Sequence, residues 1–153
     1  MIVYRLSREK YARDLSGEGA RKAGGRWNSR GIPLVYTSQS ISLCALEVAV
    51  HLPLGMAPKD YHLVSILIPD ETPMLEIPFM KLPLNWNVSL HSLTTQAIGD
   101  DFIDQAEHMV MKVPSAVVIQ EYNYLINPAH VDIKQIQITE IIPFRFDDRL
   151  FSK

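Results

Sequence analysis

Glu47 is the residue whose surroundings in the sequence point most directly to chemistry. It lies in the segment SLCALEVAVHL at 42–52, where it is the only formally charged side chain among apolar neighbours. The spacing predicts a helix over 42–52 that is hydrophobic nearly all round, as buried helices are. Carboxylates are almost never buried without a partner. Glu47 is therefore expected either to pair with a cation inside the fold or to line a cleft, and the segment alone leaves both readings open.

A second group lies in the sequence GARKAGGRWN at 19–28. The adjacent glycines Gly24 and Gly25 allow the backbone to turn sharply or to approach a ligand closely. Arg26 follows them, and a planar guanidinium on such a loop suits a phosphate or a carboxylate. The alternative is an ordinary loop with a surface arginine. The glycine spacing matches neither the phosphate-binding GxxxxGK[ST] loop nor the dinucleotide-binding GxGxxG loop.

The third group is centred on Ser115. Pro114 is expected to interrupt the pairing of strands and to turn the Ser115 hydroxyl toward an open cleft. The GxSxG sequence that surrounds the nucleophile of many serine hydrolases is missing, which argues against a hydrolase triad.

These groups must be positioned by an α+β fold. Strands are predicted at 2–6, 34–37, 62–68, 109–113, 116–119 and 135–142. Helices are predicted at 8–14, with Ser7 as its cap, at 42–52 and at 100–107. A glycine-rich loop over 17–31 and an irregular stretch over 70–92 complete the pattern. We expect one compact domain over residues 1–153, with helices packed on a central sheet of short strands.

Composition restricts the class of protein. The chain has 153 residues, of which 47% are hydrophobic, enough for the core of one domain. No apolar run reaches the about 18–20 residues that span a membrane, and the basic start is unlike a signal peptide. The single cysteine, Cys44, excludes an internal disulfide and is expected to be buried. The sequence contains no CxxC or HExxH spacing, so no metal site is predicted, and a cytoplasmic location is expected.

Charge is distributed unevenly along the chain. Residues 1–30 contain eight Lys and Arg against three Asp and Glu, whereas residues 31–153 contain seven against fourteen. The basic segment suggests a local site for an anion such as a phosphate, although a solvated basic face explains it equally well. Direct nucleic-acid binding is not expected, because the rest of the chain is acidic.

Taken together, the sequence resembles the RES domain, a family named for an arginine, a glutamate and a serine. The resemblance runs through four blocks in order: GEGARKAGGRWNSRG at 17–31, VYTSQSISLCALEVAVHL at 35–52, VPSAVVIQEYNYLINPAH at 113–130 and FRFDDRL at 144–150. The named residues correspond to Arg26, Glu47 and Ser115, and the active-site tyrosine of the family corresponds to Tyr36. Residues 70–108 match the family least.

The resemblance implies a fold similar to the ADP-ribosyltransferases of the diphtheria-toxin type. It also implies a toxin of a bacterial toxin–antitoxin pair that depletes NAD by breaking the nicotinamide–ribose bond. The implied partner is an antitoxin with an Xre-like region, bound in a hetero-oligomer around a toxin homodimer. NAD is the implied substrate, with inorganic phosphate as a possible co-substrate, and no cofactor is implied.

Roles follow for the corresponding residues. Nicotinamide leaves NAD as a neutral ring, so one carboxylate can suffice, and Glu47 would stabilise the oxocarbenium-like ribose. Arg26 would bind the pyrophosphate or an incoming phosphate, and Tyr36 would border the nicotinamide ring. Ser115 would contact the ribose or the carboxamide. Asn28, close to Arg26 in the first block, is also assigned to NAD binding.

The attacking group is left open by the sequence. Phosphate is favoured over water, because the basic residues Arg5, Arg8, Arg21, Lys22, Arg26 and Arg30 exceed what one pyrophosphate needs. Water would need a general base. Glu47 is the candidate in the motif blocks but is already assigned to the ribose, and His51, one turn further along the same helix, could serve instead. Two rival readings remain: an ADP-ribosyltransferase that modifies a protein, and a non-enzymatic binding module in which Glu47 and Arg26 form a structural ion pair.

Overall fold

One mixed β-sheet runs through the molecule. The computed structural model describes residues 1–53, 59–88 and 92–151. The strands follow the order β4-β5-β6-β2-β1-β3-β7. β4 and β5 are parallel, and every other neighbouring pair is antiparallel. Their bounds are Ile2–Arg8 for β1, Val35–Ser38 for β2, Tyr61–Leu67 for β3, Met74–Glu76 for β4, Val110–Pro114 for β5, Tyr122–Ile126 for β6 and Gln137–Phe144 for β7.

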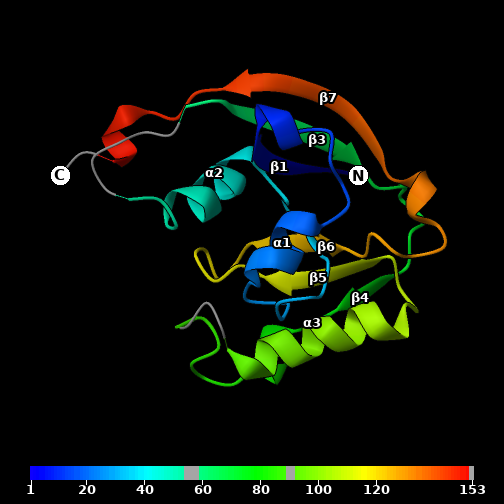
Figure 1. Ribbon diagram of the computed structural model, residues 1–153. Helices are drawn as coiled ribbons and strands as arrows, with labels where there is room; N and C mark the ends of the chain where they lie inside the picture. Colours follow the sequence, from blue (N-terminus) through cyan, green and yellow to red (C-terminus); the bar gives the residue numbers. More distant parts are fainter. Residues whose placement is uncertain (54–58, 89–91, 152–153) are drawn as a thin grey trace.

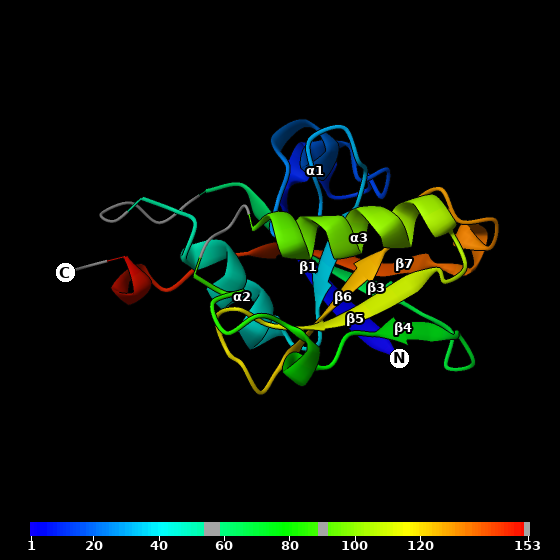
Figure 2. The same ribbon diagram turned by 90° about the horizontal axis from the view of Figure 1, so that it is seen from below.

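Within the described residues, three α-helices accompany the sheet: α1 (Glu18–Ala23), α2 (Ile41–Ala49) and α3 (Leu93–Gln105). Figures 1 and 2 show α3 lying along the half of the sheet that contains β4, β5 and β6. Figure 1 shows α2 beside the other half, next to β1 and β3. The predicted α+β class with a compact sheet of short strands is confirmed. No helix within the described ranges is both long and apolar enough to cross a membrane.

Three groups of buried apolar side chains hold these layers together. One lies among the central strands, the second lies under α3, and the third lies between α2 and the C-terminal segment. Representative members are Val3, Val64 and Ile126 in the first, Trp27, Phe102 and Met111 in the second, and Leu6, Cys44 and Phe146 in the third.

Helix α3 packs directly against the glycine-rich loop. A Cβ atom placed on Gly99 would lie 1.7 Å from the main-chain oxygen of Trp27, so only glycine permits this approach. Gln96 Nε2 donates to the carbonyl of Gly25 at 2.9 Å, and the Ser29 amide donates to Asp100 Oδ1 at 2.9 Å. The residues on either side of Arg26 are thus fixed by side chains of α3.

The predicted helix over 8–14 with Ser7 as its cap is wrong. Strand β1 continues to Arg8, because Ser7 and Arg8 pair with His62 and Tyr61 of β3. The cross-strand hydrogen bonds therefore take the residues that were expected to begin a helix. Only a three-residue 3-10 turn follows, at Glu9–Tyr11.

The glycine-rich stretch 17–31 is not loop throughout, because α1 occupies Glu18–Ala23. Glu18 forms salt bridges with Arg21 and Lys22, three and four residues further on, which is the spacing of neighbours on a helix surface. Gly17 and Gly24 flank the helix with positive φ values of 71° and 70°.

The predicted strand over 116–119 is also wrong. Ser115 Oγ accepts hydrogen bonds from the amides of Val117 and Val118, both at 3.0 Å, and these bonds stabilise a turn in place of a strand. The chain then re-enters the sheet as β6, which pairs with both β2 and β5. The apolar run AVVI suggested a strand but lies in the connection between two strands.

Several boundaries also differ from prediction. The stretch 70–92 contains β4, which pairs with β5, and residues 89–91 lie outside the described residues. Helix α3 begins at Leu93 rather than at residue 100, and α2 ends at Ala49 rather than at residue 52. α2 is not buried all round, because the apolar side chains on its outer surface are exposed: Ile41 by 40%, Leu46 by 36% and, just past its end, Val50 by 56%.

Candidate active site

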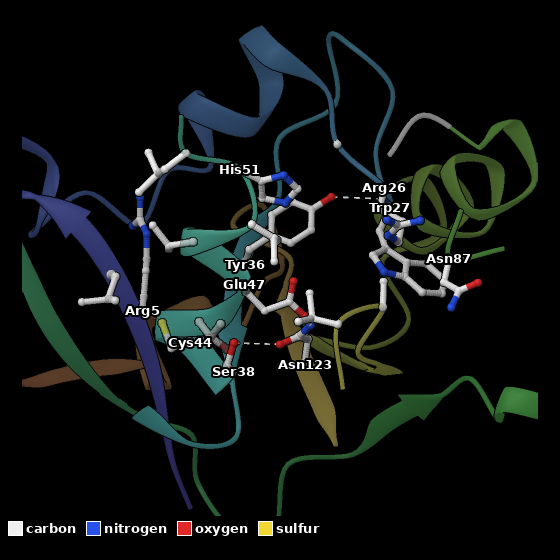
Figure 3. A pocket seen from close by; sticks show the side chains of 18 of the residues that line it. Arg5, Arg26, Trp27, Tyr36, Ser38, Cys44, Glu47, His51, Asn87 and Asn123 are labelled. Carbon is white, nitrogen blue, oxygen red and sulfur yellow. Dashed lines mark hydrogen bonds between the residues drawn. The ribbon is translucent and has the colours of Figure 1, made fainter. Parts of the chain in front are cut away.

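A pocket of about 750 Å³ opens between α2, β2 and the glycine-rich loop. Figure 3 shows Glu47 near its centre, with Arg5 and Arg26 on opposite sides. Residues 87–88 and 116–117 and the side chain of Asn123 complete its wall. The pocket thus brings together segments that are far apart in the sequence, from Arg5 to Asn123.

Helix α2 places Glu47 in this pocket. Ser40 begins the helix, and its hydroxyl accepts a hydrogen bond from the Leu43 amide at 3.1 Å. The Glu47 carboxylate is half-buried and accepts two hydrogen bonds at Oε1, from Ser115 Oγ at 2.7 Å and from Asn123 Nδ2 at 2.6 Å. Among the described residues, no salt bridge joins Glu47 to a lysine or an arginine. Of the two readings of Glu47, the structure therefore favours the cleft.

Ser115 lies behind the carboxylate and outside the pocket lining. Its side chain is fully buried, it donates to Glu47, and it accepts from two amides of the following turn. A hydroxyl with these three contacts holds the carboxylate in place. The structure places Ser115 against Glu47 and does not expose its hydroxyl to a ligand, so the expected contact of Ser115 with the ribose or the carboxamide is not supported.

Arg26 lines the pocket with its guanidinium packed against Trp86. Its Nη1 donates to the Trp86 carbonyl at 2.8 Å, and its Cζ lies 5.8 Å from the centre of the Trp86 ring. Burial lowers the pKa of Arg26, while the negative charge of Glu47 opposes that shift. The guanidinium remains a cation, held at the pocket wall by a contact from the region that matches the RES family least.

Hydrogen bonds of the Tyr36 hydroxyl hold the glycine-rich loop in place. Tyr36 lines the pocket, and its hydroxyl accepts from the Trp27 amide at 3.0 Å and donates to Asn28 Oδ1 at 2.8 Å. A Cβ on Gly25 would lie 2.5 Å from that hydroxyl, which explains the glycine. Burial raises the pKa of Tyr36, so the phenol keeps its proton.

Asn28, assigned to NAD binding from the sequence, lies behind the pocket wall. It is fully buried, and its amide donates to the carbonyls of Ala20 and Ile32, each at 2.9 Å. Its oxygen accepts from Tyr36. These contacts hold the loop, so the structure gives Asn28 a role in shaping the pocket rather than in touching a ligand.

Of the six basic candidates, the structure places Arg5 and Arg26 at the pocket. Arg5, on β1, is half-buried and donates to the carbonyl of Asp14, and burial lowers its pKa. Arg21 and Lys22 instead pair with Glu18 on the surface. Arg8 and Arg30 are exposed and do not line the pocket.

Two further ionisable groups of the motif blocks lie in the pocket. Cys44 is 4% exposed, and burial raises the pKa of its thiol to about 12, which keeps it protonated and a poor nucleophile. The predicted burial of Cys44 is confirmed. His51 lines the pocket just beyond the end of α2 and is exposed to solvent.

Sequence reasoning did not single out Asn123 or Ser38. Asn123 donates to Glu47, and Ser38 Oγ donates to Asn123 Oδ1 at 2.7 Å. Asn123 was read only as part of the block 113–130, and β6, which carries it, was not predicted. The pairing of β6 with β2 is the missing information, and local sequence does not contain it.

Comparison with protein-family models assigns the chain to a family. The model of the RES domain matches residues 2–147, nearly the whole chain. The chain belongs to the RES domain family. The predicted resemblance is therefore confirmed, and the four residues mapped from it, Arg26, Tyr36, Glu47 and Ser115, all lie within the matched region.

Curated relatives of this RES chain match along almost their full length. A protein named Toxin Res from Photorhabdus laumondii is 39% identical over 153 residues, covering 98% of this chain and 97% of the relative. A protein named Prs ADP-ribosylating toxin from a Sphingobium species is 37% identical over 144 residues, covering 93% and 89%. Another Toxin Res, from Pseudomonas putida, is 36% identical over 155 residues, covering 99% and 100%.

A solved structure has the same fold. The crystal structure of the M. tuberculosis MbcT–MbcA toxin–antitoxin complex contains a chain that superposes with a TM-score of 0.73. The match covers 98% of this RES chain and 86% of that chain, at 23% sequence identity. It supports the fold described above.

Proposed function

We propose that this RES chain is the toxin of a toxin–antitoxin pair and that it cleaves NAD at the nicotinamide–ribose bond. The observation that carries the proposal is the Glu47 carboxylate, which is held in a pocket by neutral donors and flanked by the cations of Arg5 and Arg26. One carboxylate between two cationic sites suits a substrate with a ribose beside a pyrophosphate. The names of the relatives support a toxin.

Glu47 would act on the charge that develops in the transition state. As the bond between nicotinamide and the anomeric carbon breaks, nicotinamide takes the electron pair and leaves as a neutral ring. Positive charge develops on the ribose, and a nearby carboxylate stabilises it. Because the leaving group needs no proton, no second carboxylic acid is required.

Phosphate is our proposed attacking group. An oxygen of inorganic phosphate would bond to the anomeric carbon and yield nicotinamide and ADP-ribose carrying a 1-phosphate. The support is that Arg5 and Arg26 lie on opposite sides of Glu47 (Figure 3), so that one can bind the pyrophosphate and the other the incoming phosphate. Water is the alternative, with His51 as the base at the rim of the pocket.

The proposal is tested by mixing the purified chain with NAD in phosphate-free buffer and then adding inorganic phosphate. We expect nicotinamide to appear at a rate that rises with phosphate concentration and saturates, with phosphorylated ADP-ribose as the second product. A rate that ignores phosphate, with free ADP-ribose as the product, would identify a glycohydrolase instead. If NAD is not consumed at all, the proposed activity is wrong.

Replacing Arg26 with alanine should weaken NAD binding. A charge-assisted hydrogen bond is worth about 1.5–3 kcal/mol, so we expect KM for NAD to rise roughly 10- to 150-fold. Arg5→Ala should instead raise KM for phosphate more than KM for NAD. The matched control is Arg21→Ala, which removes a surface arginine paired with Glu18 and should leave both constants near wild type. Steady-state kinetics with each substrate varied separately distinguishes the two arginines.

Transfer of ADP-ribose to a protein is the second candidate function. The Sphingobium relative that is named Prs ADP-ribosylating toxin favours it. Both reactions use the same NAD pocket and differ in the nucleophile that attacks the ribose. Incubation with NAD labelled in the adenylate, in a cell extract, distinguishes them: label on a protein band supports transfer, whereas label only in small molecules supports NAD cleavage.

The partner that we propose is a cognate antitoxin, as in the solved M. tuberculosis complex. An Xre-like region in that antitoxin and a toxin homodimer in the assembly rest on the family resemblance alone. Expression of this chain should stop bacterial growth and lower cellular NAD, and coexpression of the neighbouring antitoxin gene should restore both.

A further inference from the structure

Two neutral side chains on adjacent strands complete the surroundings of Glu47. Asn123 on β6 donates from Nδ2 to Glu47 Oε1 at 2.6 Å, and Ser38 on β2 donates from Oγ to Asn123 Oδ1 at 2.7 Å (Figure 3). Ser38 is 4% exposed. The register of the sheet pairs Ser38 with Asn123 directly, so the backbone fixes their separation.

We infer that Asn123 and Ser38 are positioning residues that determine which oxygen of Glu47 faces the substrate. Asn123 and Ser115 both donate to Oε1, and within residues 1–53, 59–88 and 92–151 no hydrogen bond reaches Oε2. Oε1 is thereby anchored, and Oε2 is presented to the ribose. This inference rests on the proposed cleavage of NAD.

An asparagine is required because its amide must accept and donate at once. The Ser38 hydroxyl donates to the amide oxygen, which leaves the amide nitrogen to face the carboxylate. Without Ser38 the amide is free to turn its oxygen toward Glu47, where two acceptors would repel. Ser38 thus acts on Glu47 only through Asn123.

Other ionisable groups share the pocket with the carboxylate that the substitution Asn123→Asp would introduce. They are Arg5 on β1, Arg26 on the glycine-rich loop, Tyr36 on β2, Cys44 on α2, His51 just after α2 and Tyr61 on β3. The variants below leave all of these groups in place, so a difference between variants reports the change at position 123.

Asn123→Asp tests the inference, because it keeps the shape of the side chain and removes the donor. At alkaline pH two carboxylates face each other at the former hydrogen-bond distance, and their repulsion displaces Glu47. On acidification the pair retains one proton, and the O–H of the protonated carboxyl replaces the amide N–H as donor. We expect kcat, relative to wild type at the same pH, to be reduced roughly 10- to 100-fold near pH 8 and to recover as pH falls.

Asn123→Ala supplies no donor at any pH, so its kcat should be reduced by a similar factor across the whole range, with little change in KM for NAD. Ser38→Ala should reduce kcat less, and it should add nothing when combined with Asn123→Ala. Asn85→Asp is the matched control. It introduces the same new carboxylate at an exposed residue that does not line the pocket, so the ratio of its kcat to the wild-type kcat should not change with pH.

The inference is wrong if Asn123→Ala keeps the wild-type kcat. It is also wrong if the ratio of the Asn123→Asp kcat to the wild-type kcat does not change with pH. A wild-type chain that cleaves no NAD refutes the proposed function instead, and the inference is then read from stability. Carboxylate repulsion should lower the Tm of Asn123→Asp at high pH, and the deficit should vanish on acidification. The Tm deficit of Asn123→Ala should not depend on pH, and equal pH dependence in both variants would contradict the inference.

Discussion

Glu47→Gln is expected to lower NAD turnover by roughly 10²–10³-fold, the usual effect of losing one preorganised electrostatic contact to a transition state. The substitution keeps the shape of the side chain, and the glutamine oxygen still accepts from Ser115 and Asn123. Only the charge is removed, so NAD binding and Tm should change little. Rates of nicotinamide release at saturating NAD measure the effect, and cells expressing the variant should grow without the antitoxin.

The control for Glu47→Gln is Glu18→Gln, which removes a surface carboxylate paired with Arg21 and Lys22 and should keep wild-type turnover. If Glu47→Gln retains wild-type turnover, the carboxylate is not catalytic. If it instead unfolds and the wild-type chain never cleaves NAD, Glu47 is a structural residue of a binding module.

Gly99→Ala should be strongly destabilising, although alanine normally favours a helix over glycine by about 1 kcal/mol. The added Cβ would lie 1.7 Å from the Trp27 carbonyl oxygen, and no rotamer relieves a clash between two backbones. α3 must then move away from the glycine-rich loop. We expect a loss of about 3 kcal/mol, near the upper end for overpacking, and a fall in Tm of roughly 6–12 °C.

Gly19→Ala is the matched control, because Gly19 lies in α1 and a Cβ there meets no atom within 4 Å. Its Tm should equal or slightly exceed that of wild type. Since the same loop carries Arg26, Gly99→Ala should also raise KM for NAD. Equal Tm values for the two alanine variants would contradict the close packing of α3 on the loop.

Features with a strong local pattern were predictable from the sequence. The alternation and β-branched residues of β1 and β3, and the apolar helix that carries Glu47, appear near their expected positions. Local hydrogen bonds and cross-strand pairing override the pattern elsewhere. Ser115 stabilises a turn where the run AVVI suggests a strand. Pairing with β3 extends β1 through Ser7 and Arg8, where a helix was expected to begin.

The candidate site was only partly predictable, for a similar reason. Glu47 is conspicuous as a lone charge in an apolar segment, and Arg26 follows a glycine pair. Asn123 has no such local signal, because its contact with Glu47 depends on the pairing of β2 with β6. Asn28 was assigned to NAD binding because it lies in the same block as Arg26. In the structure it is buried, and its amide donates to carbonyls of the loop instead.

The contacts that anchor Glu47 also bear on synthesis of the chain at the ribosome. Ser115 and Asn123 follow Glu47 by 68 and 76 residues. At a translation rate of about 5–20 residues per second, the second of these is added roughly 4–15 s after the glutamate. A nascent chain that already exposes Glu47 and Arg26 therefore lacks both anchors of the carboxylate. Translation therefore delays assembly of the candidate site until most of the chain has been made.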